Sequence, residues 1–190
     1  SLTRTLPQTG VPADAYAILK TKREGVVKEI NMNPASMTNW LALGTIHKQV
    51  NDYEGARIYY SYVTTVNPQN LTAHWNLGAL YENYLKDNAK AEVEYRAVVK
   101  LDKKYVDGYM ALHLLYLKMQ DSTKAESILT EGIAANGDSV DLFVLEAQYF
   151  ASKGNISKAK ASYDKAIAAA KALKNNELAA ILQAEKDALR

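Results

Sequence analysis

Three histidines, His47, His74 and His113, are the side chains of this sequence best suited to metal binding or acid–base catalysis. A zinc site on one helix needs two ligands on the same face, typically at positions i and i+4. No two of these histidines are that close in sequence, and each falls in a different segment. The sequence therefore predicts that each histidine packs between helices or hydrogen-bonds across them.

Other reactive patterns are also missing from the sequence. It contains no cysteine, which excludes disulfides, thiolate catalysis and cysteine-based metal sites. It has no phosphate-binding glycine loop and no nucleophile elbow. The paired charges Glu92 and Glu94, like Lys103 and Lys104, are expected on solvated surfaces or turns, where they do not converge. We therefore expect no enzymatic activity, no cofactor, no metal and no small-molecule substrate.

Composition and charge limit the class of protein. The chain has 190 residues, of which 48% are hydrophobic and 23% charged, as is usual for a globular protein. A net charge of +2 is too small to indicate nucleic-acid binding. No apolar run reaches the roughly 20 residues that span a bilayer. The sequence starts at Ser1, and three alternatives stay open: a processed end, a trimmed end, and a membrane tether upstream. The compartment, cytoplasmic or extracytoplasmic, is equally open.

Charge is unevenly distributed in the second half of the chain. Residues 106–155 contain three Lys/Arg and seven Asp/Glu, whereas residues 156–190 contain seven Lys/Arg and four Asp/Glu. Solvated helix faces explain such a pattern most simply. The alternative is that these charges orient a partner.

One spacing of large and small residues recurs in four segments, every 34 or 35 positions. The first segment contains Trp40, Leu43, Gly44 and His47, followed by Ala56, Tyr60 and Pro68. The second contains His74, Leu77, Gly78, Tyr81, Ala91 and Tyr95. The third contains Tyr109, Leu112, His113, Tyr116, Ala125 and Leu129, and the fourth Phe143, Glu146, Ala147, Phe150, Ala159 and Tyr163. A unit of this length cannot bury its apolar face alone, so the copies are expected to stack.

The breaks between apolar segments predict an all-α protein. After a linker of residues 1–12, one helix is expected over 13–30, because Pro12 suits a helix start and Asn33-Pro34 a helix end. Ser36 can cap the next helix with its side chain. Helix pairs are expected at 37–49 and 53–66, 71–84 and 89–101, 106–118 and 122–134, and 140–152 and 156–173. The one extra residue of the second copy is expected in its turn, at Asp87-Asn88, and a final helix over 177–189 is expected to cap the array.

Small residues are expected where the helices of a pair cross closely. Gly44, Gly78 and Ala147 occupy this position on the first helix of three segments, and Ala56, Ala91, Ala125 and Ala159 on the second helix. Trp40, Tyr109 and Phe143 are expected to fill the space that the small residues leave.

These residues resemble the tetratricopeptide repeat family, whose pattern is Trp-x2-Leu-Gly-x2-Tyr, then Ala-x3-Phe and Pro. The match is nearly complete in the first segment and weakest where His113 and Glu146 replace the expected glycine and leucine. The resemblance implies a right-handed α-solenoid of about four helix pairs, with an extra N-terminal helix and a C-terminal capping helix. It implies one domain over 13–190, with repeats at about 37–70, 71–105, 106–139 and 140–173.

The resemblance also implies a non-enzymatic adaptor whose first helices line a concave groove for a protein or peptide. The corresponding groove residues are Leu41, Thr45, Lys48, Gln49, Trp75, Asn76, Ala79, Glu82, Asn83, Asp107, Met110, Leu114, Lys118, Val144, Gln148 and Ser152. Members that capture chaperone carboxylate tails carry several cations here, whereas this sequence has only Lys48 and Lys118. We therefore expect no chaperone-tail binding.

An apolar floor replaces those cations. It consists of Leu41, Trp75, Met110, Leu114 and Val144. A partner helix or extended peptide can lie on such a floor, with Trp75 and Met110 as anchors. Two alternatives remain open: residues 1–13 fold back over it through Leu2, Leu6 and Val11, or a second copy of the chain self-associates there as part of a structural assembly.

Overall fold

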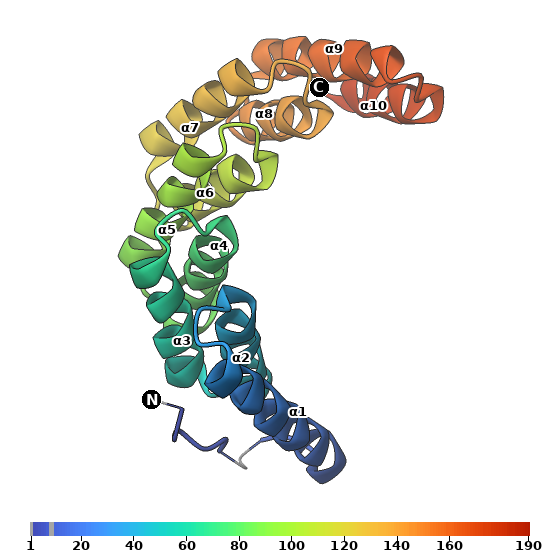
Figure 1. The fold of residues 1–190 in the computed structure, drawn as a ribbon. Helices are drawn as coiled ribbons and strands as arrows, with labels where there is room; N and C mark the ends of the chain where they lie inside the picture. The colour runs from blue at the N-terminus through green and yellow to red at the C-terminus, as the bar shows by residue number, and fades with distance from the viewer. Residues whose placement is uncertain (1, 8–9) are drawn as a thin grey trace. The chain divides into compact units, whose positions relative to one another are not determined.

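The computed structural model describes residues 2–7 and 10–190, and in this part of the chain it contains α-helices, one π-helical turn and no strand (Figure 1). The fold is all-α, as predicted. The helices are α1 (Ala13–Met32), α2 (Met37–Gln49), α3 (Tyr53–Val66), α4 (Leu71–Leu80), α5 (Asn88–Leu101), α6 (Val106–Lys118), α7 (Ser122–Ala135), α8 (Val140–Ser152), α9 (Ile156–Ala172) and α10 (Asn176–Ala188). The π-helical turn η1 (Tyr81–Leu85) follows α4 directly.

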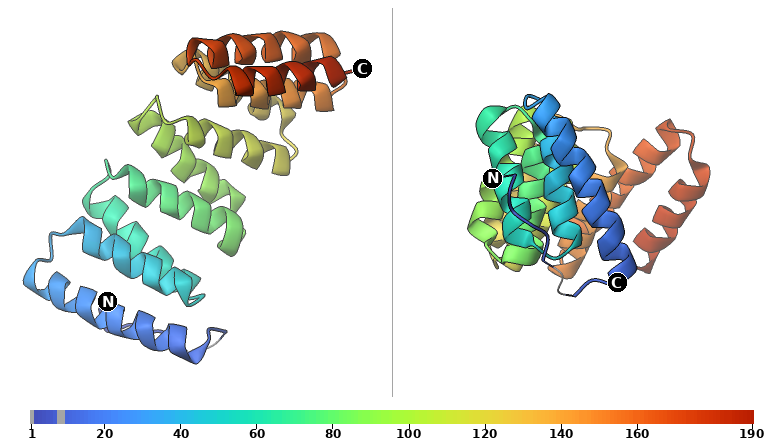
Figure 2. Two further views of the ribbon diagram at one scale, coloured as in Figure 1. Left: turned by 90° about the vertical axis from the view of Figure 1, so that its right-hand side faces the viewer. Right: turned by 60° about the horizontal axis from the view of Figure 1, so that its bottom comes forward.

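The chain divides into two compact units, Ser1–Leu101 and Asp102–Arg190. In the first unit α2 packs against α3 and α4 against α5, while α1 packs on α2. In the second unit α6 packs against α7 and α8 against α9, and α10 lies along α9 (Figure 2). Each unit therefore contains two of the four expected helix pairs. A single domain over 13–190 stays a prediction.

One turn geometry joins the two helices of each pair. In each turn a residue with positive φ directly precedes an Asp or Asn. The residues with positive φ are Asn51, Lys86, Gln120, Gly154 and Lys174. The following Asx side chain accepts a hydrogen bond from the backbone N–H three residues later, as Asp121 does from Lys124 at 2.9 Å. Such a bond satisfies one of the free N–H groups at a helix start. The same turn geometry joins α9 to α10. The connection between α9 and α10 is therefore like the connection between the first and second helix of a repeat.

Ser36 starts α2 without the expected side-chain cap. Ser36 precedes the helix, but its hydroxyl accepts no capping bond. Its carbonyl instead accepts from the N–H groups of Asn39 and Trp40. The prediction of the helix start was correct and that of the capping contact was wrong.

The extra residue of the second repeat lies in a helix and not in the turn at Asp87-Asn88. Residues Tyr81–Leu85 widen into a π-helical turn, which ends at Lys86 with φ 57°. The N–H of Asp87 then bonds back to the carbonyl of Tyr81 at 3.0 Å. A π-turn accommodates one additional residue without breaking the helix. The expected helix over 71–84 is therefore an α-helix that ends at Leu80 and continues as η1.

Glycine allows the helices of a pair to touch at two positions on the first helix. A Cβ atom on Gly44 would lie 2.4 Å from the Tyr60 ring, and one on Gly78 would lie 2.6 Å from the Tyr95 ring. In the third repeat the arrangement is reversed. Gly132 of the second helix, α7, receives Tyr109 of the first helix, since a Cβ atom there would lie 2.8 Å from that ring. This confirms the close crossing of the helices.

Trp40 does not fill the space at Gly44, contrary to the expectation. Tyr60 of the second helix fills it, while the half-buried Trp40 ring packs on Tyr62 with centroids 4.4 Å apart. The Trp40 Nε1–H donates to the carbonyl of Pro34 at 2.8 Å. Trp40 therefore joins the outer side of the pair to the α1–α2 connection.

The described residues of the N-terminal arm fold back on the first helix pair. Leu6 is buried against Ile46 and Val50 of α2, and Leu2 packs against the cluster of Ile30, Leu43 and Tyr59. The Tyr16 hydroxyl donates to the carbonyl of Leu6 at 2.9 Å. These contacts place the described arm residues on the core of α1–α3 and not on the expected apolar floor.

We expect Gly44→Ala and Gly25→Ala to change stability in opposite directions. Both glycines are inside helices, but a Cβ atom at Gly25 meets nothing within 4 Å. Gly25→Ala should raise the free energy of unfolding by about 0.5–1 kcal/mol, because alanine loses less backbone entropy. Gly44→Ala should lower it by about 1–3 kcal/mol, because the Tyr60 ring must move. Urea denaturation measures both, and equal changes would contradict the packing described.

Candidate functional site

The expected binding residues of the first unit lie on α2, α4 and η1. We call this set the first groove face: Leu41, Thr45, Lys48, Trp75, Asn76, Ala79 and Glu82. All seven are partly exposed. The second helix α3 packs against both α2 and α4, which fixes the two first helices through a shared neighbour. The expected flanking residues Gln49 and Asn83 are exposed.

Tyrosines of the second helices hold two polar groups of the first groove face. The Thr45 hydroxyl bonds to the carbonyl of Leu41 and shares a 3.1 Å hydrogen bond with the hydroxyl of Tyr60. The Tyr95 hydroxyl donates to Glu82 Oε2 at 3.0 Å, and burial, together with the Glu82 carboxylate, raises the pKa of Tyr95. The π-turn carries Glu82, so this turn positions a carboxylate at the edge of the face.

Three other residues supply what a ligand can contact. The Trp75 ring packs on Tyr95 with centroids 5.4 Å apart, which leaves the indole half-buried. The side chains of Lys48 and Asn76 make no hydrogen bond or ion pair with the described residues. A free amide and a free ammonium beside an indole are groups that bind polar backbone and acidic side chains.

The second unit carries the remaining expected residues on α6 and α8, which contact each other. We call the set Met110, Leu114, Val144 and Gln148 the second groove face. Met110 and Val144 are partly buried and Gln148 is exposed, while Leu114 is 52% exposed. Asp107, Lys118 and Ser152 are exposed as well. An apolar side chain exposed to this degree on a helix is available to a partner.

All three histidines are hydrogen-bonded within the chain. His113 Nδ1 lies 2.8 Å from the carbonyl of Ala125 and therefore links α6 to α7. His74 Nδ1 lies 2.6 Å from Glu94 Oε2, and its Nε2 lies 3.0 Å from the carbonyl of Pro68. The histidines have the packing role that the sequence predicted. Glu94 was expected on a solvated surface, but it is half-buried and holds α5 to α4.

A buried carboxylate joins the arm to the first helix pair. Asp52 accepts from Arg4 Nε at 2.7 Å and from the N–H of Gly55 at 3.0 Å, and Asp52 Oδ2 lies 2.7 Å from His47 Nδ1. The Arg23 guanidinium donates to the carbonyl of Leu2 at 2.7 Å. One side chain therefore caps α3, orients His47 and binds the arm. Sequence reasoning identified Asp52 as part of a helix break but missed the ion pair, because Arg4 is remote in sequence.

The pKa values of Asp52 and His47 follow from this arrangement. Burial alone would raise the pKa of Asp52, but hydrogen bonds from Arg4, His47 and Gly55 outweigh it and lower the pKa to about 2. Burial lowers the pKa of His47 and of His113. Neutral histidines and an ionised Asp52 are therefore the forms that the folded chain favours near neutral pH.

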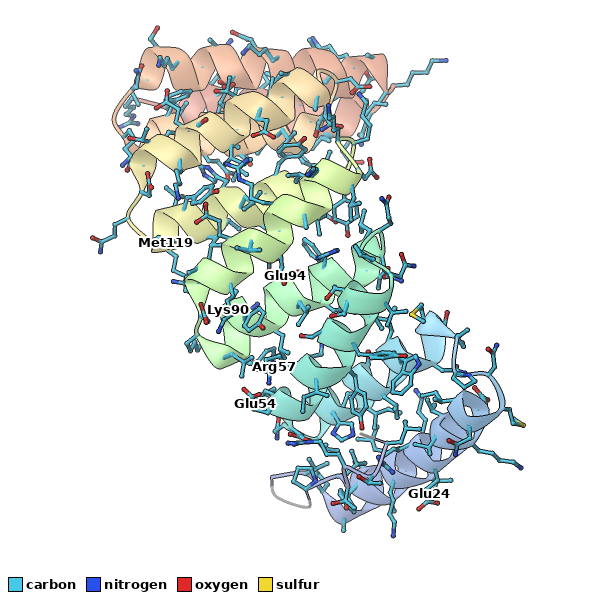
Figure 3. The ribbon with its side chains drawn as sticks, turned by 60° about the vertical axis from the view of Figure 1, so that its left-hand side comes forward. Glu24, Glu54, Arg57, Lys90, Glu94 and Met119 are labelled. Atoms are coloured by element: carbon cyan, nitrogen blue, oxygen red, sulfur yellow. The ribbon has the colours of Figure 1, made fainter. Side chains whose placement is uncertain are left out.

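A charged hollow of about 400 Å³ lies between α3 and α5 in the first unit. Glu54 and Arg57 of α3 and Lys90 of α5 line it (Figure 3). Arg57 pairs with Glu54 at 2.7 Å and Lys90 with Asp87 at 2.7 Å. Since its cations are already paired, this hollow offers no free charge to an ionic ligand.

Antiparallel helix pairs, repeated with the same turn geometry, define a helical repeat protein. The family model described as tetratricopeptide repeat matches residues 38–70 and 140–173. These segments are the first and fourth expected repeats. The chain therefore contains tetratricopeptide repeats in these two segments, and proteins with such repeats are in general scaffolds for protein–protein interaction.

Solved structures share the fold at low sequence identity. A structure of MamA superposes with a TM-score of 0.65 at 15% identity, and covers 86% of this chain and 98% of its own. A tetratricopeptide repeat protein from Parabacteroides merdae gives 0.60 at 18% identity, with 93% and 77% covered. YrrB, described as having an unusual peptide-binding site, gives 0.58 at 14% identity, with 87% and 92% covered. Identities this low establish the fold alone.

Two further findings concern relatives and membrane-spanning helices. No curated protein matches the sequence. Within residues 2–7 and 10–190, no helix is both long and apolar enough to cross a bilayer.

We expect Asp52→Asn to remove an acid-sensitive part of the stability. The folded pKa of Asp52 lies below its unfolded value of about 3.9, so the stabilisation is present above pH 4 and disappears as the pH falls towards 2. The variant should lose about 2 kcal/mol of unfolding free energy at pH 7 and almost nothing near pH 2.

Asp121→Asn is the matched control. Asp121 makes the same helix-capping bond but has no ion pair with a described residue. Because asparagine keeps either cap, the control should change little at any pH. If denaturation at pH 7 and pH 2 gives equal losses for Asp52→Asn, the ion pair does not contribute as described.

Proposed function

We propose that this chain is a non-enzymatic scaffold whose first helices bind a peptide or helix of a partner protein. The observation that supports the proposal is that the side chains of Lys48 and Asn76 are partly exposed and unpaired, on the two first helices that also carry the partly exposed Leu41 and Trp75. Apolar anchors give a peptide affinity, and polar groups beside them fix its direction.

The chemistry of the face indicates an extended or helical segment as ligand. The Asn76 amide can donate to a backbone carbonyl and accept from a backbone N–H of a bound chain. Trp75 is braced by Tyr95, so binding a partner does not require ordering a mobile ring. The bound segment carries apolar side chains towards Leu41 and Trp75 and an acidic group towards Lys48.

The second groove face offers an apolar surface of its own on α6 and α8. Leu114 and Met110 on this face suit an aliphatic side chain of a partner. The low number of cations on both faces supports the expectation that chaperone carboxylate tails are not ligands.

A second candidate function is self-association through α1. On this helix Ile18 is 68% exposed, and a shallow hollow of about 480 Å³ surrounds it, lined also by Ala17, Thr21 and Lys22. An apolar residue this exposed at the first helix of a repeat array favours contact with another copy within a larger assembly.

We expect Ala79→Arg to weaken binding of a peptide selected against this chain by at least about tenfold, because the long cation occupies the first groove face. The peptide is obtained by phage display and its affinity measured by calorimetry. Ala89→Arg, at an exposed site near the start of α5, is the matched control. If both variants bind the peptide equally well, the face is not its site.

We expect Ile18→Lys to abolish any increase of molar mass with concentration that light scattering detects for the wild-type chain. The charge of the new lysine would lose its hydration if it were buried in such a contact, which costs free energy. A wild-type chain that stays monomeric, or a variant that associates as the wild type does, contradicts self-association through α1.

A further inference from the structure

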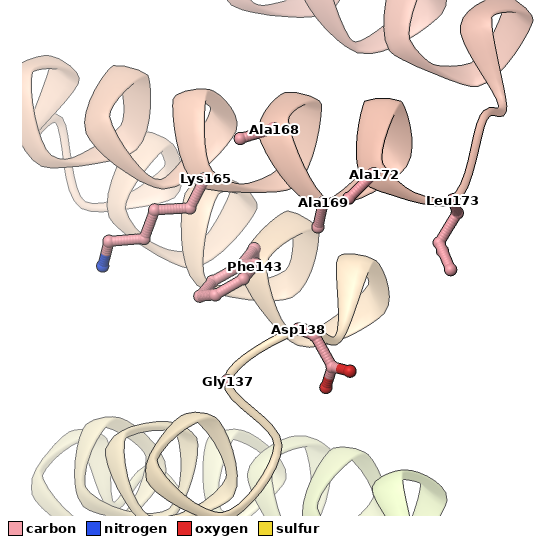
Figure 4. A pocket seen from close by; sticks show the side chains of 8 residues that line it. All are labelled: Gly137, Asp138, Phe143, Lys165, Ala168, Ala169, Ala172 and Leu173. Atoms are coloured by element: carbon pink, nitrogen blue, oxygen red, sulfur yellow. The ribbon is translucent and has the colours of Figure 1, made fainter.

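The second unit contains a hollow of about 470 Å³ whose lining includes no residue of either groove face (Figure 4). Phe143 of α8 forms its floor, and Gly137 and Asp138 of the α7–α8 loop form one side. The rest of the wall comes from the end of α9: Lys165, Ala168, Ala169, Ala172 and Leu173. Leu173 is 70% exposed, and the hollow is within the size range of ligand-binding pockets.

At one position beside the hollow the fourth repeat lacks a ring that the first repeat has. By the repeat spacing, Phe143 corresponds to Trp40 and Lys165 to Tyr62. In the first repeat the ring of Tyr62 packs on that of Trp40, with centroids 4.4 Å apart. In the fourth repeat the Lys165 ammonium lies over the Phe143 ring, 5.6 Å from its centroid, and Phe143 is 6% exposed.

Alanines further widen the space beside Phe143. Ala169 stands where the first repeat has Val66, and Ala168 and Ala172 are exposed beside it. Lys165 reaches over the floor towards Glu146, whose Oε2 lies 3.5 Å from its Nζ. A ring that packs beside Phe143 in this hollow would therefore come from outside this helix pair.

The charged residues at the rim of the hollow indicate which charge a bound partner segment would carry next to its ring. Asp138 is exposed and forms no hydrogen bond or ion pair with the described residues. The cation across the hollow, Lys165, is already paired with Glu146. Among the residues that line the hollow, the one charge without a partner in the described part of the chain is therefore the negative charge of Asp138.

We propose that this hollow binds a segment of a partner protein in which an aromatic residue is adjacent to an arginine or lysine. The ring packs against Phe143, Ala169 and Leu173, and the cation pairs with Asp138. This site is independent of the first groove face, so the scaffold holds two partner segments, or two parts of one partner, at separate places.

The probes are three N-acetylated, C-amidated dipeptides: phenylalanyl-arginine, phenylalanyl-glutamate and alanyl-arginine. Each is titrated into the whole ¹⁵N-labelled chain up to about 10 mM, a range in which contacts of only a few kcal/mol still give binding. We expect amide shifts at Gly137, Ala168, Ala169 and Ala172 with phenylalanyl-arginine. Its affinity should exceed that of phenylalanyl-glutamate about threefold, the effect of one exposed ion pair, and alanyl-arginine should cause no shift there.

Two variants identify the groups responsible. Asp138→Asn should remove the preference for arginine over glutamate and leave the aromatic binding. Ala168→Phe, at an exposed position, should abolish the shifts with every probe, whereas Ala180→Phe at an exposed position of α10 should change nothing. The proposal is overturned if no probe shifts these amides, if Ala168→Phe binds like the wild type, or if alanyl-arginine binds as well as phenylalanyl-arginine.

Discussion

Close contact between a glycine and a tyrosine ring is the constraint on which each of the first three helix pairs depends. Where Gly44 or Gly78 lies on the first helix, a tyrosine of the second helix presses on its backbone. In the third pair the glycine is Gly132 and the ring is that of Tyr109, so the two partners have exchanged helices. The physical requirement is one small and one large residue at the crossing, whichever helix supplies each. At the glycine position of the repeat pattern the third pair has His113, whose Nδ1 lies 2.8 Å from the carbonyl of Ala125 on α7.

Local chemistry made most of the fold predictable from the sequence. The spacing of apolar residues and the Asx and proline residues at the turns predicted α2, α3, α6 and α8 with the bounds that the structure has. These signals act over a few residues, so they can be recognised without knowing what lies opposite. The π-turn at Tyr81–Leu85 was missed, because a single extra residue can lengthen a turn or widen a helix, and packing against α5 decides between them.

The candidate sites were less predictable, because they also depend on which side chains from different helices pack together. The positions of Trp75 and Asn76 follow from the repeat pattern, but Tyr95 bracing Trp75 and bonding Glu82 does not. The hollow beside Phe143 is produced by the absence of a large side chain on α9. A run of alanines in a helix has no distinctive signal in a single sequence, since alanine is also the best helix former.

The ion pair between Arg4 and Asp52 joins residues 48 positions apart, which has a consequence for the order in which the chain becomes structured. The arm can dock only after α2 and α3 have paired, because that pairing positions Asp52 and assembles the surface around Val50. Ordering the arm then costs conformational entropy, which only the contacts of the arm itself can offset. The arm is therefore among the last segments of the first unit to become ordered and among the first to detach, and its departure uncovers the end of that unit while the glycine–tyrosine crossings stay closed.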